Sequence, residues 1–310
     1  MTYLFIISLL LYGLRALHYH GLLKQENGFY GKYSTIFLKQ NNYTAIFLGS
    51  SRAETQYHPL IFDSITGLRS YNIGLKGATP RLANMMLSLY LINSKTPDHV
   101  IYEVDYHYLK YRAEEIMEFN NFFPYLKYES VRKEFSKIDR RMEHFYLNPY
   151  YSFPYTGLKN LSTSLHGWLD LPNASDNDYV KGYLKVVQKR NSVLRKESPV
   201  YSFIDPVERN YIDSIISQCE NKHIRLTFAL SPLYANGKLS LTNKEEILRN
   251  LRNIATIHNI GIIDLSSADF SNDRTMFVDN NHLSYQGSLK YSLLFAETFN
   301  NKVLLKPLKP

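Results

Sequence analysis

Short apolar runs alternate with helical patterns along most of this chain, and this alternation constrains its fold more than any other feature. The runs are rich in β-branched and aromatic residues, as buried strands are, and lie at residues 43–48, 70–73, 99–104, 224–230 and 260–265. Between them, apolar residues recur at helical spacing over residues 81–93, 207–221 and 244–258. Strands that alternate with amphipathic helices predict an α/β fold, with a parallel sheet of about five strands covered on both faces.

The alternation stops between Tyr106 and about Pro199. This stretch contains the only tryptophan, Trp168, and many tyrosine and phenylalanine residues. We therefore predict a helical, aromatic-rich insertion at about residues 108–200, without further sheet. Its aromatic side chains form either the insertion's own core or a surface on which sugars stack.

Composition excludes several classes of protein. The 310 residues are 45% hydrophobic and 21% charged, which is typical of a globular chain and not of a disordered or fibrous one. The single cysteine, Cys219, excludes an intramolecular disulfide framework and a zinc site made of cysteines alone. The net charge of +8 favours anionic surroundings, but the basic residues form no long run, so we predict no nucleic-acid partner.

The first residues are strongly apolar. No charge occurs between Met1 and Leu14, and continuation through Leu23 reaches the roughly 20 residues that a membrane span needs. We interpret residues 1–23 as a membrane anchor or uncleaved signal, followed by a connector at 24–42. An amphipathic helix packed on the domain is the alternative. The basic residues that follow favour a cytoplasmic body by the positive-inside rule, so sequence leaves the orientation open.

Polar and glycine-rich segments follow the first three predicted strands. Gly49-Ser50-Ser51-Arg52 follows the first, a loop with Gly74 and Gly77 follows the second, and Glu103 to His107 ends the third. Because the carboxyl ends of parallel strands share one edge of a sheet, these segments are expected to meet there. A serine in such a turn exposes its hydroxyl, and nearby glycine N–H groups can bind an oxyanion. Helix capping and structural turns are the ordinary alternatives.

A fourth polar segment precedes the last predicted helix. In it Asp279 stands three residues before His282. The carboxylate can orient one imidazole nitrogen while the other faces a nucleophile, which is the arrangement that serine catalysis requires. Metal ligation is the alternative for this spacing. No second carboxylate or histidine cluster accompanies it, so we predict no metal and no cofactor.

The order of these segments resembles the GDSL/SGNH hydrolase superfamily over roughly residues 43–300. The Gly-Ser-Ser-Arg opening and the Asp-x-x-His-Leu-x-x-x-Gly ending are most similar to cell-envelope members that assist teichoic-acid D-alanylation or polysaccharide O-acetylation. The resemblance implies a three-layer, flavodoxin-like domain at 43–303 and a tail at 304–310. It implies Ser51 as nucleophile, His282 as base and Asp279 as its orienting acid.

The resemblance also implies an oxyanion hole, and here the sequence departs from the family. The backbone N–H groups of Ser51 and Gly77 match two donors. The asparagine expected after the third strand is absent, and aligning Glu103 with the family's strand end places His107 at that position. An imidazole N–H would then supply the third hydrogen bond. Without it, an enzyme would be slow or restricted in substrate.

These features predict a serine esterase or acyltransferase that forms an acyl-enzyme on acylated cell-envelope glycans or related esters. Its expected partners are the membrane and a membrane acyltransferase, with the body outside the cytoplasm. Within enzymes, a deacylating esterase is the alternative. From a different class, the chain is a catalytically silent glycan-binding or scaffold protein that retains the fold.

Overall fold

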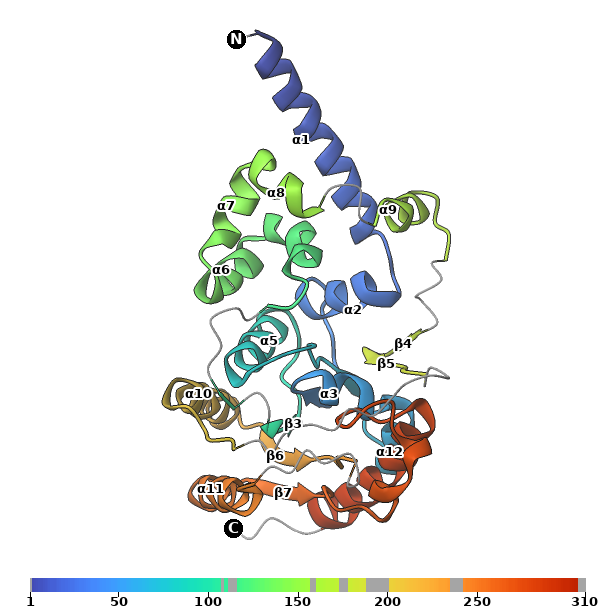
Figure 1. Cartoon of the computed structure of the whole chain (residues 1–310), viewed down its shortest axis with the longest axis vertical. Helices are drawn as coiled ribbons and strands as arrows, with labels where there is room; N and C mark the ends of the chain where they lie inside the picture. Colours follow the sequence, from blue (N-terminus) through green and yellow to red (C-terminus); the bar gives the residue numbers. More distant parts are fainter. Residues whose placement is uncertain are drawn as a thin grey trace. The chain divides into compact units, whose positions relative to one another are not determined.

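The structure is a computed structural model that describes residues 2–106, 109–110, 116–156, 160–172, 178–187, 201–234 and 242–305 (Figure 1). The chain divides into two compact units, described in turn. The sheet unit comprises Asn42–Leu87, Ser94–Glu115 and Val180–Pro310. The helical unit comprises Met1–Asn41, Ser88–Asn93 and Ile116–Tyr179.

A five-stranded parallel sheet forms the centre of the sheet unit, with strand order β2-β1-β3-β6-β7. Its strands are β1 (Ala45–Leu48), β2 (Ser70–Asn72), β3 (His99–Glu103), β6 (Arg225–Leu230) and β7 (Gly261–Asp264). All five lie within the predicted runs. In chain order the arrangement is 2-1-3-4-5, the flavodoxin-like order, which confirms the predicted fold class.

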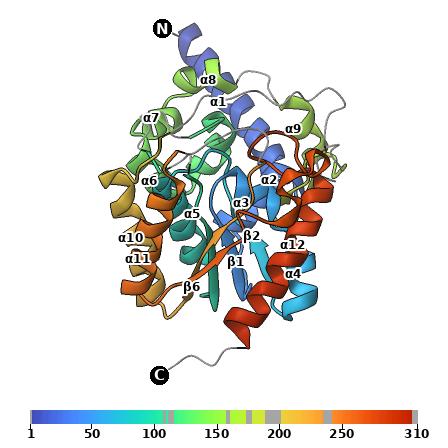
Figure 2. The same ribbon diagram turned by 60° about the horizontal axis from the view of Figure 1, so that its bottom comes forward.

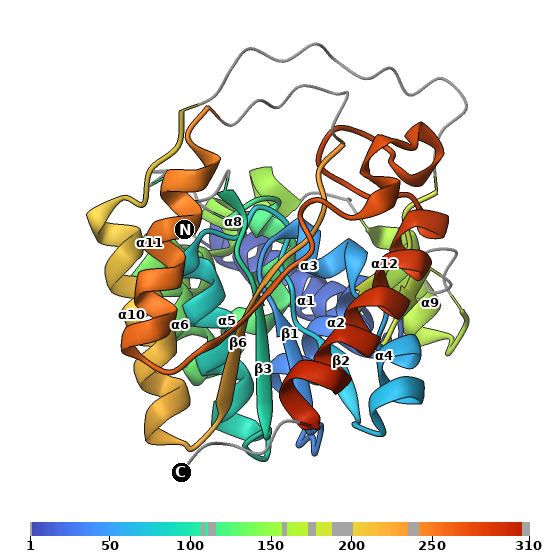
Figure 3. The same cartoon turned by 90° about the horizontal axis from the view of Figure 1, so that it is seen from below.

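Helices cover both faces of this sheet (Figures 2 and 3). On one face lie α4 (Pro59–Thr66) and α12 (Tyr285–Phe299), and on the other lie α5 (Pro80–Asn93), α10 (Pro206–Asn221) and α11 (Lys244–Ile257). Every residue of β1 and β3 is buried, which explains why these strands read as continuous apolar runs. Phe47 of β1 contacts the rings of Phe62 and Phe295 at 5.0 and 6.3 Å, in the core that α4 and α12 close.

The helices begin where local chemistry favours a start. The α4, α5 and α10 helices each begin at a proline, whose missing N–H costs nothing in a first turn. Asp205 caps α10 by accepting the Val207 N–H at 2.8 Å, and Ser284 caps α12 by accepting the Gly287 N–H at 3.2 Å. The helices predicted at 81–93, 207–221 and 244–258 are therefore confirmed to within one residue at each end.

The helical unit consists of α1 (Thr2–Leu23), α2 (Gly28–Phe37), the 3-10 helix η2 (Phe119–Lys127), α6 (Glu129–Ile138), α7 (Arg141–Leu147), α8 (Pro149–Thr156) and α9 (Leu161–Trp168). Its aromatic residues form a core of their own: the rings of Phe122 and Phe135 lie 5.1 Å apart, and Tyr33 contacts Phe122 at 4.9 Å. The segment interpreted as a connector contains α2.

The insertion is helical, as predicted, except for one small sheet. The short strands β4 (Tyr179–Val180) and β5 (Tyr183–Leu184) pair with each other, which corrects the expectation that the insertion contains no strands. Lys181 and Gly182 join them with φ of 46° and 79°. Positive φ at both positions is the geometry of a tight primed hairpin turn, in which glycine is favoured.

Residues 2–23 form one helix, as predicted. Over Phe5–Leu23 it is apolar enough to cross a membrane, with a mean hydropathy of 1.2, and only 11% of that window is buried. A core helix of a water-soluble domain would be mostly buried, whereas a membrane span or a signal sequence would not. Of the short segments that remain, the structure describes α3 (Ser51–Gln56), the 3-10 helices η5 (Asp269–Asn272) and η6 (Arg274–Met276), and the π-helix η7 (Asn300–Leu304).

Candidate active site

Ser51 stands at the carboxyl edge of the sheet, directly after β1. Gly49, with φ of 142°, turns the chain from the strand into α3. A side chain at Gly49 would bring a Cβ within 2.8 Å of the Glu103 carbonyl oxygen, so this close approach requires glycine. Ser50 caps α3 by accepting the Arg52 N–H at 3.2 Å. Ser51 is therefore the first residue of the helix, where its own N–H has no carbonyl partner within the helix.

His282 lies in the segment that leads into α12, and the structure brings it to Ser51. Its Nε2 is 2.8 Å from Ser51 Oγ, and its Nδ1 is 2.9 Å from Asp279 Oδ2. Because a carboxylate only accepts hydrogen bonds, Nδ1 carries the proton and Nε2 is left to accept from the serine hydroxyl. Ser51 is buried, while the His282 and Asp279 side chains are 26% and 54% exposed.

Asp279 also fixes the backbone of its own turn. Its Oδ1 accepts the N–H groups of Asn281 and His282, both at 2.8 Å. Burial tends to raise the pKa of Asp279, but the hydrogen bond from His282 and these backbone N–H groups outweigh it and hold the pKa below its ordinary value. The carboxylate is thus ionised near neutral pH, as a group that orients an imidazole must be.

Helix α3 is tied to the histidine segment and to α12. Gln56 donates from Nε2 to the Asn281 carbonyl at 3.0 Å. The Ser292 hydroxyl of α12 donates to the Gln56 carbonyl at 3.0 Å and accepts the His58 N–H at 2.8 Å. These bonds hold α3, which supplies the serine, next to the segment that supplies the histidine.

The loop after β2 lies beside the same turn. Asn72 accepts the Gly74 N–H at 3.0 Å and donates to the Ala53 carbonyl at 2.7 Å, which joins this loop to α3. Gly77 has a φ of 74°, a conformation that favours glycine. The oxyanion role of the Gly77 N–H stays a prediction. His107, the third predicted donor, lies outside the described residues.

A buried polar cluster of Arg52, Tyr57, Glu103 and Ser231 lies next to the serine turn. It was not predicted from the sequence. Arg52 is fully buried and lies 3.3 Å from Glu103 Oε1, at the end of β3. Its guanidinium donates to the carbonyl and, at 2.7 Å, to the hydroxyl of Ser231, which in turn donates to Glu103 at 2.6 Å. Tyr57 donates its hydroxyl to the other oxygen of Glu103.

Asp105 also belongs to this cluster. Its Oδ2 accepts the Ser50 hydroxyl at 2.6 Å, and its Oδ1 lies 3.9 Å from Arg52. Asp105 therefore holds the serine that caps α3. Burial raises the pKa of Glu103, and the Arg52 cation with the hydrogen bonds from Ser231 and Tyr57 opposes this rise.

The signal for this cluster was present in the sequence as Arg52, Glu103 and Asp105 at strand ends. Charged residues directly after apolar strands are either solvated or paired, and without the strand order their pairing could not be assigned. Among the residues that the structure describes, no group of three or more histidine, cysteine, aspartate or glutamate side chains is placed to hold a metal ion.

No protein-family model matches the sequence, and no curated protein is significantly similar to it. Among solved structures, the chain is similar to one described as a lipolytic protein of the G-D-S-L family from Desulfitobacterium hafniense, at 12% identity and a TM-score of 0.43, over 83% of this chain and 99% of that one. It is also similar to one described as an acylhydrolase from Bacteroides fragilis, at 13% identity and a TM-score of 0.42, over 88% of this chain and 95% of that one.

Proposed function

We propose that this chain is a serine-dependent acyl-ester hydrolase or acyltransferase of the GDSL/SGNH type. The observation that carries the proposal is the hydrogen-bonded series from Ser51 through His282 to Asp279, with distances of 2.8 and 2.9 Å. A hydroxyl, an imidazole and an ionised carboxylate in this order are what nucleophilic acyl transfer requires. Their position at the carboxyl edge of a parallel sheet, where such folds bind ligands, is further support.

In the proposed reaction, Ser51 Oγ attacks the carbonyl carbon of an ester while its proton passes to His282 Nε2. The negative charge that forms on the carbonyl oxygen is bound by the N–H groups of Ser51 and Gly77, with His107 as the third donor. When the ester bond breaks, the imidazolium gives its proton to the departing alcohol oxygen. Water, or the hydroxyl of a sugar, then attacks the acyl-enzyme with His282 as base, which restores free Ser51.

The acylated group is proposed to be a cell-envelope glycan or a related ester. This choice rests on the resemblance of the Gly-Ser-Ser-Arg and Asp-x-x-His segments to envelope members of the superfamily. The apolar α1 helix supports anchoring at a membrane, with the body outside the cytoplasm, where such glycans occur. A membrane acyltransferase is the proposed partner, because an acyl group handed across the membrane needs an acceptor enzyme on the glycan side.

A fluorophosphonate probe tests the activated serine without knowledge of the substrate. Wild-type protein is expected to be labelled, Ser51→Ala to remain unlabelled and His282→Ala to be labelled at a strongly reduced rate. The release of acetate from an acetylated glycan, with and without added sugar acceptor, then separates hydrolysis from transfer. A folded wild-type protein that is never labelled would contradict the proposal.

The second candidate is a catalytically silent scaffold or glycan-binding protein. The feature that favours it is the segment after β3, where the asparagine donor that active members of the superfamily use is absent, and where Asp105 binds Ser50. Under this alternative the triad geometry persists without turnover. Glycan binding that Ser51→Ala leaves unchanged, in a protein that the probe does not label, would support it.

A further inference from the structure

Helix α1 packs against two short helices that contain no Asp, Glu, Lys or Arg. These are α8 and α9, with sequences Pro-Tyr-Tyr-Ser-Phe-Pro-Tyr-Thr and Leu-Ser-Thr-Ser-Leu-His-Gly-Trp. Water-exposed helices of a soluble protein usually carry charges on their outer face. Here the large exposed side chains are instead apolar or aromatic: Tyr150, Tyr151 and Tyr155 on α8, and Leu161, Leu165 and Trp168 on α9.

Helix α9 is held against α1 by backbone contact. A Cβ at Gly21 of α1 would lie 2.4 Å from the Ser164 carbonyl oxygen, and a Cβ at Gly167 would lie 1.9 Å from the Gly21 carbonyl oxygen. Small residues that allow such close approach are typical of helix pairs in membranes. The Ser164 hydroxyl and the Trp168 indole N–H donate to the α1 carbonyls of His18 and Leu17, at 2.9 and 3.0 Å. The other face of α9 is thereby turned outward.

Helix α8 and the end of α7 are held along α1 by hydrogen bonds. The hydroxyl groups of Ser8 and Tyr150 lie 2.6 Å apart, and the Tyr12 hydroxyl donates to the Leu147 carbonyl at 2.6 Å. The Arg15 guanidinium donates to the carbonyls of Phe145 and Tyr146, at 3.4 and 3.3 Å. The last carbonyls of α7 are therefore satisfied by α1 side chains, as backbone groups next to hydrocarbon must be.

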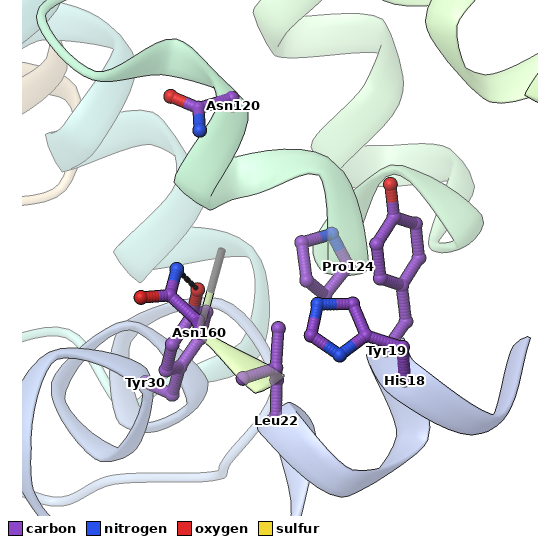
Figure 4. A pocket seen from close by; sticks show the side chains of 7 residues that line it. All are labelled: His18, Tyr19, Leu22, Tyr30, Asn120, Pro124 and Asn160. Carbon is purple, nitrogen blue, oxygen red and sulfur yellow. Dashed lines mark hydrogen bonds between the residues drawn. The ribbon is translucent and has the colours of Figure 1, made fainter. Parts of the chain in front are cut away.

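The surroundings of α1 become polar toward its carboxyl end. There a small pocket is lined by His18, Tyr19, Leu22, Tyr30, Asn120, Pro124 and Asn160 (Figure 4). Asn160 donates to the Tyr30 hydroxyl at 3.0 Å, and Lys24 lies 4.6 Å from the Trp168 ring centre. Tryptophan and lysine side chains are typical of the level at which a membrane-spanning helix meets the lipid headgroups. Trp168 and Lys24 lie at such a position, where the apolar part of α1 ends and polar residues begin.

We propose that the exposed faces of α8 and α9 bind a lipid bilayer together with α1. The argument rests on the proposed anchoring of α1. The candidate span, Phe5–Leu23, contains every α1 residue that contacts the end of α7, α8 or α9 through the bonds above. A bilayer that receives this span must therefore meet both helices, and both have the uncharged, aromatic-rich composition that this position requires.

Trp168 provides a direct test because it is the only tryptophan in the chain. The full-length protein is reconstituted into vesicles of phosphatidylcholine and phosphatidylglycerol, with or without bromine atoms on the acyl chains. Emission from Trp168 is expected to fall about twofold in the brominated vesicles, since bromine quenches only indoles at membrane depth. A Trp168→Phe/Tyr151→Trp variant reports on α8 in the same way.

The matched control is Trp168→Phe/Ile257→Trp, because Ile257 is 75% exposed on α11 in the sheet unit. Its emission is expected to be the same in both kinds of vesicle. Flotation of the vesicles is measured in parallel. Protein that floats with the vesicles while the probes at 168 and 151 stay unquenched would overturn this inference alone. If the protein does not float with the vesicles, both this inference and the proposed anchoring of α1 are wrong. The labelling of Ser51 tests the proposed catalytic function independently of either result.

Discussion

Arg52 and Glu103 form a buried ion pair beneath the candidate nucleophile, with 3.3 Å between their charged atoms and neither side chain more than 1% exposed. Arg52 directly follows Ser51 in α3, and Glu103 ends β3. The pair therefore ties the serine turn to the centre of the sheet. Removal of one partner from a buried pair leaves an uncompensated charge, whereas removal of both often costs little.

The first prediction follows from this asymmetry. Arg52→Met is expected to lower the free energy of unfolding by about 3 to 5 kcal/mol. Arg52→Met/Glu103→Leu is expected to lose less than Arg52→Met alone, because the Glu103 carboxylate is then not left buried without its cation. Urea denaturation measures both. Arg209→Met is the control, since Arg209 and Asp213 form a half-exposed pair on α10 whose loss should cost less than about 1 kcal/mol. Glu103→Leu is measured alone as well. A double variant whose loss of unfolding free energy equals the sum of the two single losses would contradict this prediction.

The strands and main helices could be predicted from sequence because each produces a local pattern of apolar residues. Phe47 and Ile101 lie in short apolar runs that need no long-range information to be recognised as strands. The order of those strands is a long-range property, and the flavodoxin-like order came from the resemblance of the motifs. Ser51, His282 and Asp279 could be singled out because each follows a strand or precedes a helix with a recognisable turn.

The parts that sequence missed depend on pairings between distant residues. Arg52, Glu103 and Ser231 are brought together by three different strand ends, and no local pattern marks a charged residue as buried. The small β4–β5 sheet was missed because its strands have two residues each, which is too short for a strand periodicity to be recognised. The extent of contact between α1 and the insertion could not be derived from either segment alone.

The second prediction concerns Asp279. Asp279→Asn is expected to slow fluorophosphonate labelling of Ser51 by about a thousandfold or more, because an amide no longer fixes the imidazole tautomer or stabilises its protonated form. Melting temperature should change little, since the side chain is half exposed. Asp273→Asn is the matched control: Asp273 also accepts a backbone N–H two residues on, from Thr275, but it lies at η6. Equal labelling rates for the two variants would refute the role of Asp279.

The third prediction concerns His107, whose assignment rests on the family resemblance alone. His107→Ala is expected to lower the labelling rate by about ten- to a thousandfold, as loss of an oxyanion donor does in serine hydrolases. His107→Asn should retain more activity than His107→Ala, because an amide can donate from a similar position. Labelling rates are compared with melting temperatures. Unchanged rates with lowered melting temperatures in both variants would show that His107 only supports the fold.

The fourth prediction compares two glycines that both have positive φ. Gly67 has φ of 70° and open space around its missing Cβ, so Gly67→Ala should cost only about 1 kcal/mol of left-handed strain. At Gly49 a Cβ would also lie 2.8 Å from the Glu103 carbonyl oxygen and 3.0 Å from Ala53 Cβ. Gly49→Ala should therefore lose clearly more stability and also slow Ser51 labelling, because the clash displaces the serine turn. Equal losses of unfolding free energy and equal Ser51 labelling rates in the two variants would show that the close contacts at Gly49 do not require glycine.

The last prediction concerns pH and a histidine at the opposite end of β3 from the site. His99 is 1% exposed, and within the described residues neither of its ring nitrogens has a hydrogen-bond partner. Burial, assisted by the Arg225 cation, lowers the pKa of His99 from 6.5 to about 4. The folded protein therefore resists a proton that the unfolded chain accepts at about pH 6.5.

The sign follows from proton linkage. Between about pH 6.5 and pH 4 the unfolded state binds more protons at this position, so the stability that neutral His99 contributes is fully present above pH 6.5 and is lost as pH falls through this window. The loss at His99 is expected to be about 2 to 3 kcal/mol at pH 4. His99→Phe should remove it, because phenylalanine keeps the edge contact with the Phe299 ring, now 5.3 Å away, and cannot be protonated. Urea denaturation of both proteins at pH 7 and pH 4 measures the difference, and an equal loss of stability in wild type and variant would show that His99 is not its source.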